Sequence, residues 1–216
     1  MPDRSRAVKA LGGAVLAVGA ALSLIGGARA TPTNAASESA LIPLLRHGGY
    51  VMVMRHAHAP AQPPPAAEAD PANTGRERQL DAAGRESASA MGAALRRLHI
   101  PIGEVWSSPT YRARETVRLA GLPAPHLSDE LGDKGHSMQA AGEGQAAWLR
   151  SQVNRPPKRG TDTVIVTHDP NMRAAFGQQA DGLGDGEAMI FRPRRSGSAE
   201  FVGRVPVGDW PLLAGG

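Results

Sequence analysis

The chain has 216 residues and no cysteine, which excludes disulfide bonds and thiolate chemistry. It carries 24 basic and 20 acidic residues, a formal net charge of +4. Residues 1–30 hold four of the basic residues and one of the acidic ones, so the remainder is close to neutral at about +1. We therefore expect no nucleic-acid partner.

The first thirty residues are typical of an export signal. Three basic residues precede the uncharged, apolar stretch 10–27, and Ala28-Arg29-Ala30 matches the small-x-small cleavage pattern. We predict cleavage after Ala30 and an exported protein, periplasmic or extracellular. The alternative is a retained membrane anchor, because the apolar stretch approaches the roughly 20 residues that span a bilayer.

After the signal, residues 31–40 are small and polar and predict a flexible lead-in, followed by a single domain over 41–216. Short apolar runs rich in valine predict buried strands, and apolar residues at steps of three and four predict amphipathic helices. The predicted strands are 50–54, 103–108, 162–168, 187–193 and 199–207, and the predicted helices are 81–99, 109–121, 143–153 and the segment from 169. This alternation predicts a three-layer α/β/α sandwich with a mostly parallel central sheet and an antiparallel edge.

An arginine-histidine pair occurs twice, as Arg46-His47 and as Arg55-His56. In open α/β sheets, ligands bind beyond the carboxyl ends of the central strands. Arg55 and His56 directly follow the most strongly apolar strand, whereas Arg46 and His47 precede two glycines of a turn. We therefore expect Arg55-His56 to be functional and His47 to be a surface or capping histidine.

Two further strands end in a similar way. Ser108 is the expected N-cap of a helix that opens at Pro109 and carries Arg112 in its first turn. In the same way, His168 ends the strand 162–168, Asp169 is the expected N-cap, and Pro170 opens the next helix. Helix N-termini and arginine side chains both favour anions, and arginine matches phosphate oxygens in particular. The sequence predicts a phosphate pocket at this edge of the sheet.

In four segments the sequence resembles the histidine phosphatase superfamily, which includes phosphoglycerate mutases and acid phosphatases. They are "VMVMRHA", "LDAAGRESASAMGAAL", "WSSPTYRARET" and "VIVTHDPN", in the order of the family, with Ala57 where the family has glycine. The resemblance implies a phosphomonoesterase that needs no cofactor, with His56 as the nucleophile that becomes phosphorylated. It also implies that Arg55, Arg112 and His168 bind and polarise the phosphoryl group.

The leaving group needs a proton, and the sequence offers several carboxyl groups for it. By similarity to one branch of the family we favour Glu130, while Asp129, Asp133 and Asp169 stay open as alternatives. His58 is more simply explained as a pocket-rim or solvent-exposed histidine. Arg76 and Arg78 could reach a substrate phosphate, but a solvated charge at the entry of a helix is the more usual explanation.

For the substrate we expect a phosphorylated small molecule or an envelope sugar phosphate; the sequence gives no oligomeric state. Two other functions stay open. One is a phosphate- or sugar-phosphate-binding module without turnover. The other is a metal site built on His56, His58 and His168, together with Asp169, because histidines two residues apart can share a metal. That second alternative leaves Arg55 and Arg112 unexplained.

Overall fold

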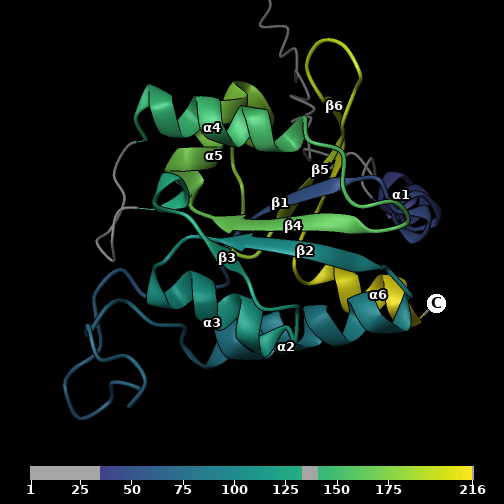
Figure 1. Ribbon diagram of the computed structural model, residues 1–216. Coiled ribbons are helices and arrows are strands. Elements are labelled where there is room, and N and C mark those ends of the chain that lie inside the picture. Colours follow the sequence, from purple (N-terminus) through teal and green to yellow (C-terminus); the bar gives the residue numbers. More distant parts are fainter. Residues whose placement is uncertain (1–34, 133–140, 216) are drawn as a thin grey trace, which may run out of the picture. The chain divides into compact units, whose positions relative to one another are not determined.

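The computed structural model describes residues 35–132 and 141–215 (Figure 1). These residues belong to one compact unit. The predicted signal segment and Asp133 lie outside the described residues. In the part of the chain that is described, no helix combines the length and the apolar character that crossing a membrane requires.

The centre of the fold is one six-stranded sheet. Its strands are β1 (Val51–Arg55), β2 (Ile102–Ser107), β3 (His126–Leu127), β4 (Asp162–Thr167), β5 (Ala188–Arg192) and β6 (Glu200–Val205). They lie in the order β3-β2-β4-β1-β5-β6; the first four are parallel, and β5 and β6 are antiparallel. The predicted mostly parallel sheet with an antiparallel edge is confirmed.

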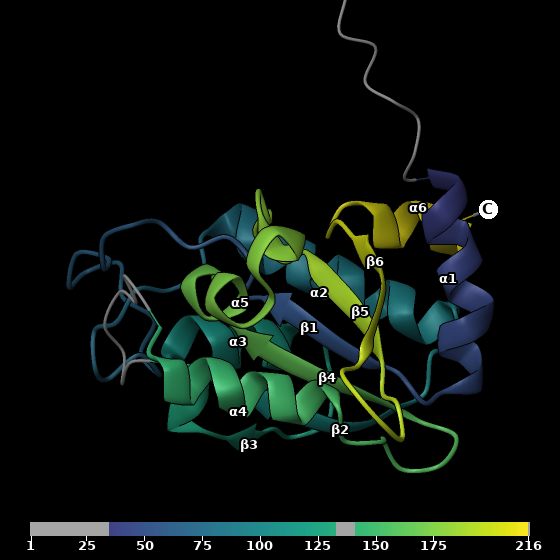
Figure 2. The same cartoon turned by 90° about the horizontal axis from the view of Figure 1, so that it is seen from above.

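Helices cover both faces of this sheet, as Figures 1 and 2 show. On one face lie α1 (Ala35–His47), α2 (Ala82–Arg97), α3 (Tyr111–Leu119) and α6 (Asp209–Gly215), and on the other lie α4 (Glu143–Val153) and α5 (Asp169–Phe176). Strand β1 serves both cores, because Met52 and Met54 point to the first face while Val51 and Val53 point to the second. A strand buried on both sides explains why its sequence is continuously apolar.

Two terminal helices differ from the predicted elements. Helix α1 begins inside 31–40, so the flexible lead-in is wrong from Ala35 onward; Glu38 and Leu41 are buried, which fixes this segment to the domain. Helix α6 was not predicted, although Trp210 within it is only 1% exposed. Both helices are held by contacts with residues far away in the sequence, which local patterns do not reveal.

The two helix starts near the predicted pocket also shift by one or two residues. Helix α3 begins at Tyr111 with Thr110 as its N-cap residue, not at Pro109 with Ser108. Helix α5 begins at Asp169, with His168 in the N-cap position. Ser108 is therefore not the N-cap residue of α3, and its hydroxyl takes part in the site described next.

Candidate active site

The carboxyl ends of β1, β2 and β4 meet at one edge of the sheet. His56 follows β1, Ser108 follows β2, and His168 follows β4; the backbone N–H of His56 donates to Thr167 O at 3.0 Å, which fixes the two strand ends side by side. Helices α3 and α5 start at this edge, and α3 contributes Arg112 from its first turn. The parallel topology thus gathers residues that are far apart in the chain.

Arg112 connects the two histidines. Its Nε donates to His56 Nε2 at 3.2 Å, and its Nη2 lies 3.2 Å from His168 Nδ1. The ring centroids of the two histidines are 5.2 Å apart, and all three side chains are buried. The structure therefore brings together His56, Arg112 and His168, as the sequence predicted.

The hydrogen bonds define which nitrogen of His56 is free to react. His56 Nδ1 lies 2.7 Å from Ala57 O; a carbonyl only accepts, so Nδ1 carries the proton and Nε2 keeps its lone pair. Burial lowers the pKa of His56 to about 3, and the positive charges of Arg112, Arg55 and Arg78 act in the same direction. At neutral pH this imidazole is uncharged and its Nε2 faces Arg112.

His168 is oriented by a chain of hydrogen bonds. Since Arg112 donates to its Nδ1, its proton lies on Nε2, which is 2.9 Å from Ser108 Oγ; Ser108 Oγ in turn donates to Thr110 Oγ1 at 3.2 Å. Burial also places the pKa of His168 well below its ordinary value. Gly132 packs directly against these hydrogen-bonded side chains. A Cβ at this position would lie 2.1 Å from Ser108 Oγ.

Ala57, which stands where the related family has glycine, fits its position. Its side chain is buried, its φ is not positive, and its N–H donates to Thr116 Oγ1 at 3.0 Å. Thr116 Oγ1 donates in turn to the carbonyl of Arg112. The turn after His56 is therefore tied to the helix that carries Arg112.

A cavity of about 300 Å³ opens at this edge. It is lined by Arg55, His56, Arg78, Arg112, His168, Asp169, Pro170 and Arg173. Four arginines and one carboxylate give it a strong positive character, which suits an oxyanion such as phosphate.

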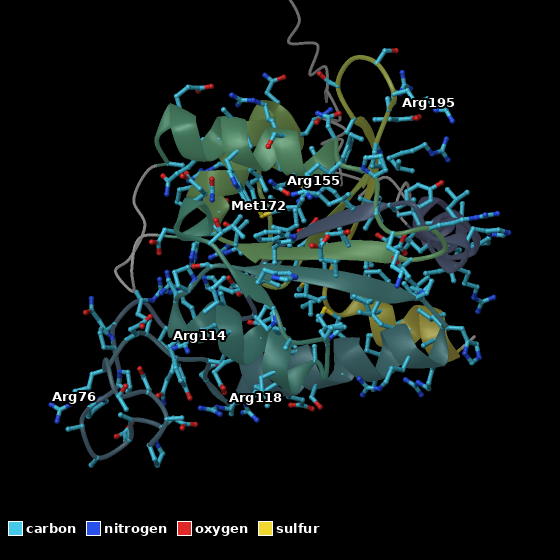
Figure 3. The ribbon with its side chains drawn as sticks, in the orientation of Figure 1. Arg76, Arg114, Arg118, Arg155, Met172 and Arg195 are labelled. Carbon is cyan, nitrogen blue, oxygen red and sulfur yellow. The ribbon has the colours of Figure 1, made fainter. Side chains whose placement is uncertain are left out.

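Neither Arg78 nor Arg173 was assigned to the site from the sequence. Arg78 was interpreted as a solvated charge, but the carbonyls of Ala59 and Pro60 hold its guanidinium at 2.7 and 2.6 Å, so that it lines the cavity. Arg76, two residues earlier, is exposed on the outer bend of the same loop (Figure 3). Arg173 was not considered, although its position one helical turn after Asp169 was a usable signal.

The carboxyl groups considered as proton donors differ in position. Asp169 lines the cavity and forms an ion pair with Arg173 at 2.8 Å. Glu130 and Asp129 are exposed in the short helix η1 (Asp129–Leu131) and do not line the cavity. The backbone of η1 is fixed to the site, since Asn171 Nδ2 donates to Glu130 O and Thr167 Oγ1 donates to Leu131 O.

The remaining histidines lie elsewhere. His47 is exposed at the end of α1, with Nδ1 near Pro43 O, as expected for a capping histidine. His58 is half-exposed and contacts Asp185 and Asp81 rather than the other two histidines. Among residues 35–132 and 141–215, no three histidine, aspartate or glutamate side chains are grouped to hold a metal. The proposed metal set of His56, His58 and His168 is therefore not assembled by these residues.

The family model described as histidine phosphatase superfamily (branch 1) matches residues 51–133. This segment of the chain is therefore similar to the histidine phosphatase superfamily. Within the matched range lie Arg55, His56 and Arg112, and His168 comes from the segment beyond it. The match supports the histidine-type phosphatase that the sequence predicted.

Solved structures agree with this fold. The protein histidine phosphatase SixA complexed with tungstate is 20% identical, covers 74% of this chain and 98% of its own, and superposes with a TM-score of 0.54. A putative phosphohistidine phosphatase SixA from Agrobacterium tumefaciens is 16% identical, with 73% and 98% coverage and a TM-score of 0.51. At such identities the likeness concerns the fold alone. No curated protein matches the sequence.

Proposed function

We propose that this protein is a histidine phosphatase, namely an exported phosphomonoesterase that hydrolyses phosphate esters through a phosphohistidine on His56, without a metal. The observation that carries the proposal is the position of Arg112, which contacts the reactive nitrogen of His56 and His168 at 3.2 Å each within an arginine-lined cavity. A buried, uncharged imidazole beside fixed cations is suited to attack a phosphoryl group.

In the first step the Nε2 lone pair of His56 forms a bond to phosphorus while the bond from phosphorus to the ester oxygen breaks. The Arg112 Nε–H, which donates to His56 Nε2 in the free protein, now donates to a phosphoryl oxygen instead. Arg55 and His168 contact the other phosphoryl oxygens. Charge spreads over these oxygens in the transition state, so fixed donors around them supply most of the catalysis. The leaving oxygen takes a proton from a carboxyl group.

In the second step a water oxygen attacks phosphorus and the bond from His56 Nε2 to phosphorus breaks. The proton released by water returns to the carboxylate, so that neutral imidazole, phosphate and the alcohol are the products. Splitting one displacement into two in this way is the general advantage of a covalent intermediate.

For the carboxyl group we propose Glu130. The Asp169 carboxylate is already engaged by Arg173, whereas Glu130 belongs to η1, whose backbone is bonded to Asn171 and Thr167 beside His168. Glu130→Gln should lower turnover of esters with poor leaving groups more than of p-nitrophenyl phosphate, whose leaving group needs no proton. Asp169→Asn is the matched comparison. If Asp169→Asn rather than Glu130→Gln shows this selective loss on poor leaving groups, Asp169 is the proton donor.

For the substrate we propose a phosphorylated small molecule or an envelope sugar phosphate. The cavity of about 300 Å³ accommodates a phosphoryl group with a small leaving group, and the predicted signal segment supports an envelope location. Fusing residues 1–30 to a reporter that is active only after export tests the location. Mass determination of the mature protein tests cleavage after Ala30.

The reaction itself is tested with a panel of phosphomonoesters, followed by trapping and mapping of an acid-labile phosphoenzyme. We expect the label on His56, its loss in His56→Ala, and its retention in His47→Ala, which serves as the control. Phosphate binding that persists in His56→Ala with no turnover in the parent protein would favour the binding module instead. Activity abolished by a chelator and restored by a metal would contradict the metal-independent reaction.

A further inference from the structure

The loop between η2 (Gly177–Ala180) and β5 contacts the Arg55-His56 pair. The carbonyl of Leu183 accepts from Arg55 Nη1 at 3.1 Å, and Asp185 Oδ1 forms an ion pair with Arg55 Nη2 at 2.8 Å. The backbone continues this contact, since Gly186 N–H donates to His56 O and Arg55 N–H donates to Glu187 O. The family-model match, which ends at residue 133, does not include this loop.

We propose that Asp185 is a positioning residue for the phosphate-binding guanidinium of Arg55, an inference that rests on the proposed function. The Oδ1 atom of Asp185 is shielded from solvent, and within the described residues it has no hydrogen bond besides this ion pair. Leu183 is buried in the second core and anchors the loop. Leu183 O and Asp185 Oδ1 each contact one terminal nitrogen of the Arg55 guanidinium. Its remaining N–H groups are then available to the cavity that Arg55 lines.

His58 holds the other oxygen of the same carboxylate. Its Nδ1 donates to Asp185 Oδ2 at 2.6 Å, and its Nε2 lies 3.4 Å from Asp81 Oδ2 at the start of α2. Asp81 itself is fixed as the N-cap of α2 through Gly84 N–H. Asp185 is thus held from two sides, and His58 acts on Arg55 through it.

Two effects of Asp185 on phosphate binding oppose each other. Its negative charge weakens the attraction of the cavity for an anion, while its contact restricts a long, flexible side chain to one orientation. The side chains of Arg55 and Asp185 are each about a quarter exposed, so solvent screens the effect of the charge. Restricting orientation keeps its full value, because the arginine fork binds phosphate oxygens only in a fixed geometry. We therefore expect orientation to dominate.

The test is calorimetric binding of inorganic phosphate to the full-length protein. Asp185→Asn should weaken phosphate binding by about tenfold, the scale of one charge-assisted contact. Asp181→Asn, an exposed position in the same loop, removes the same charge away from Arg55 and should change binding by less than about twofold. Asp185→Glu, which keeps the carboxylate, should recover part of the loss.

A double-mutant cycle with Arg55→Ala separates positioning from a general structural effect. In the Arg55→Ala background the Asp185→Asn change should have no further effect on phosphate binding.

Variants of His58 test the same contact from its other side. His58→Ala should weaken phosphate binding by about threefold, and His58→Asn, whose amide can donate in place of Nδ1, should lose less. Tighter phosphate binding in Asp185→Asn, or an equal loss with and without Arg55, would overturn the proposal. If Asp185→Asn does not fold, the two His58 variants decide.

Because the measurement is binding, it can be read independently of turnover. A parent protein that binds phosphate but hydrolyses no ester would refute the proposed function and leave the Asp185 cycle interpretable. A parent protein that turns over esters, with an Asp185→Asn variant that binds phosphate as tightly as the parent, would refute the positioning role alone.

Discussion

Arg112 Nε lies 3.2 Å from His56 Nε2, although 56 residues separate them in the chain. The guanidinium is only 1% exposed, and its nearest partners at this edge are two histidines that burial keeps uncharged. A cation buried beside two uncharged imidazoles is well placed to bind an anionic phosphoryl group.

The first prediction concerns Arg112 itself. Arg112→Lys should lower kcat/KM on p-nitrophenyl phosphate by about 100-fold or more, because a single ammonium cannot contact both histidines and phosphate oxygens. Arg114→Lys is the matched control: Arg114 is exposed on the same helix (Figure 3) and should keep nearly full activity. Equal activity of the two variants would contradict the bridging role.

The second prediction concerns the pH dependence of stability. The pKa of His56 is about 3 in the folded protein and about 6.5 when unfolded, so the unfolded state binds more protons between these values. This histidine therefore lowers the free energy of unfolding as the pH falls through that window. Between pH 7.5 and pH 4.5, the free energy of unfolding measured in urea should fall less for His56→Gln than for the parent, by on the order of 2 kcal/mol. Parallel changes in the two proteins would contradict the lowered pKa.

The third prediction concerns Asp162, which is buried at the other end of the sheet. Burial raises its pKa to about 7, while Tyr50 N–H donates to its Oδ1 at 2.9 Å. Because the folded-state pKa is raised, the group destabilises the fold progressively as the pH rises above its unfolded value near 4 and through 7. Asp162→Asn keeps the acceptor without the charge, so its stability relative to the parent should improve from pH 5 to pH 8 in urea unfolding. Asp162→Leu, which lacks the acceptor, should be less stable than Asp162→Asn at both values.

The fourth prediction concerns Gly132. Its backbone is extended, which any residue adopts, so an added Cβ acts through contact alone: it would lie 2.1 Å from Ser108 Oγ and 3.4 Å from His168 Nε2. Gly132→Ala should displace Ser108, misorient His168 and lower kcat by about tenfold or more. Gly144→Ala, where a Cβ meets nothing within 4 Å, should leave kcat unchanged. Wild-type kcat in Gly132→Ala would show that the bond from His168 to Ser108 has no role in turnover.

Much of the fold follows from local patterns in the sequence. Runs such as 50–54 and 164–166 are apolar at every position, as expected for strands buried on both faces. Since parallel strands end at a common edge, the residues after each run were expected to meet, and His56, Arg112 and His168 do so. Local patterns predicted the helix starts less well, because Ser108 and Thr110 are both common N-cap residue types.

The sequence by itself determined the layered sheet and the residues at its carboxyl edge, because both depend on the short-range periodicity of apolar side chains. Only the tertiary structure decided what surrounds them: Arg78 enters the cavity and Asp185 reaches Arg55 from loops without any periodic pattern. The course of such loops is set by contacts with distant segments, as when Leu183 anchors one of them in a core formed by other elements. The same reason hid α6, whose burial depends on a helix more than a hundred residues earlier in the chain.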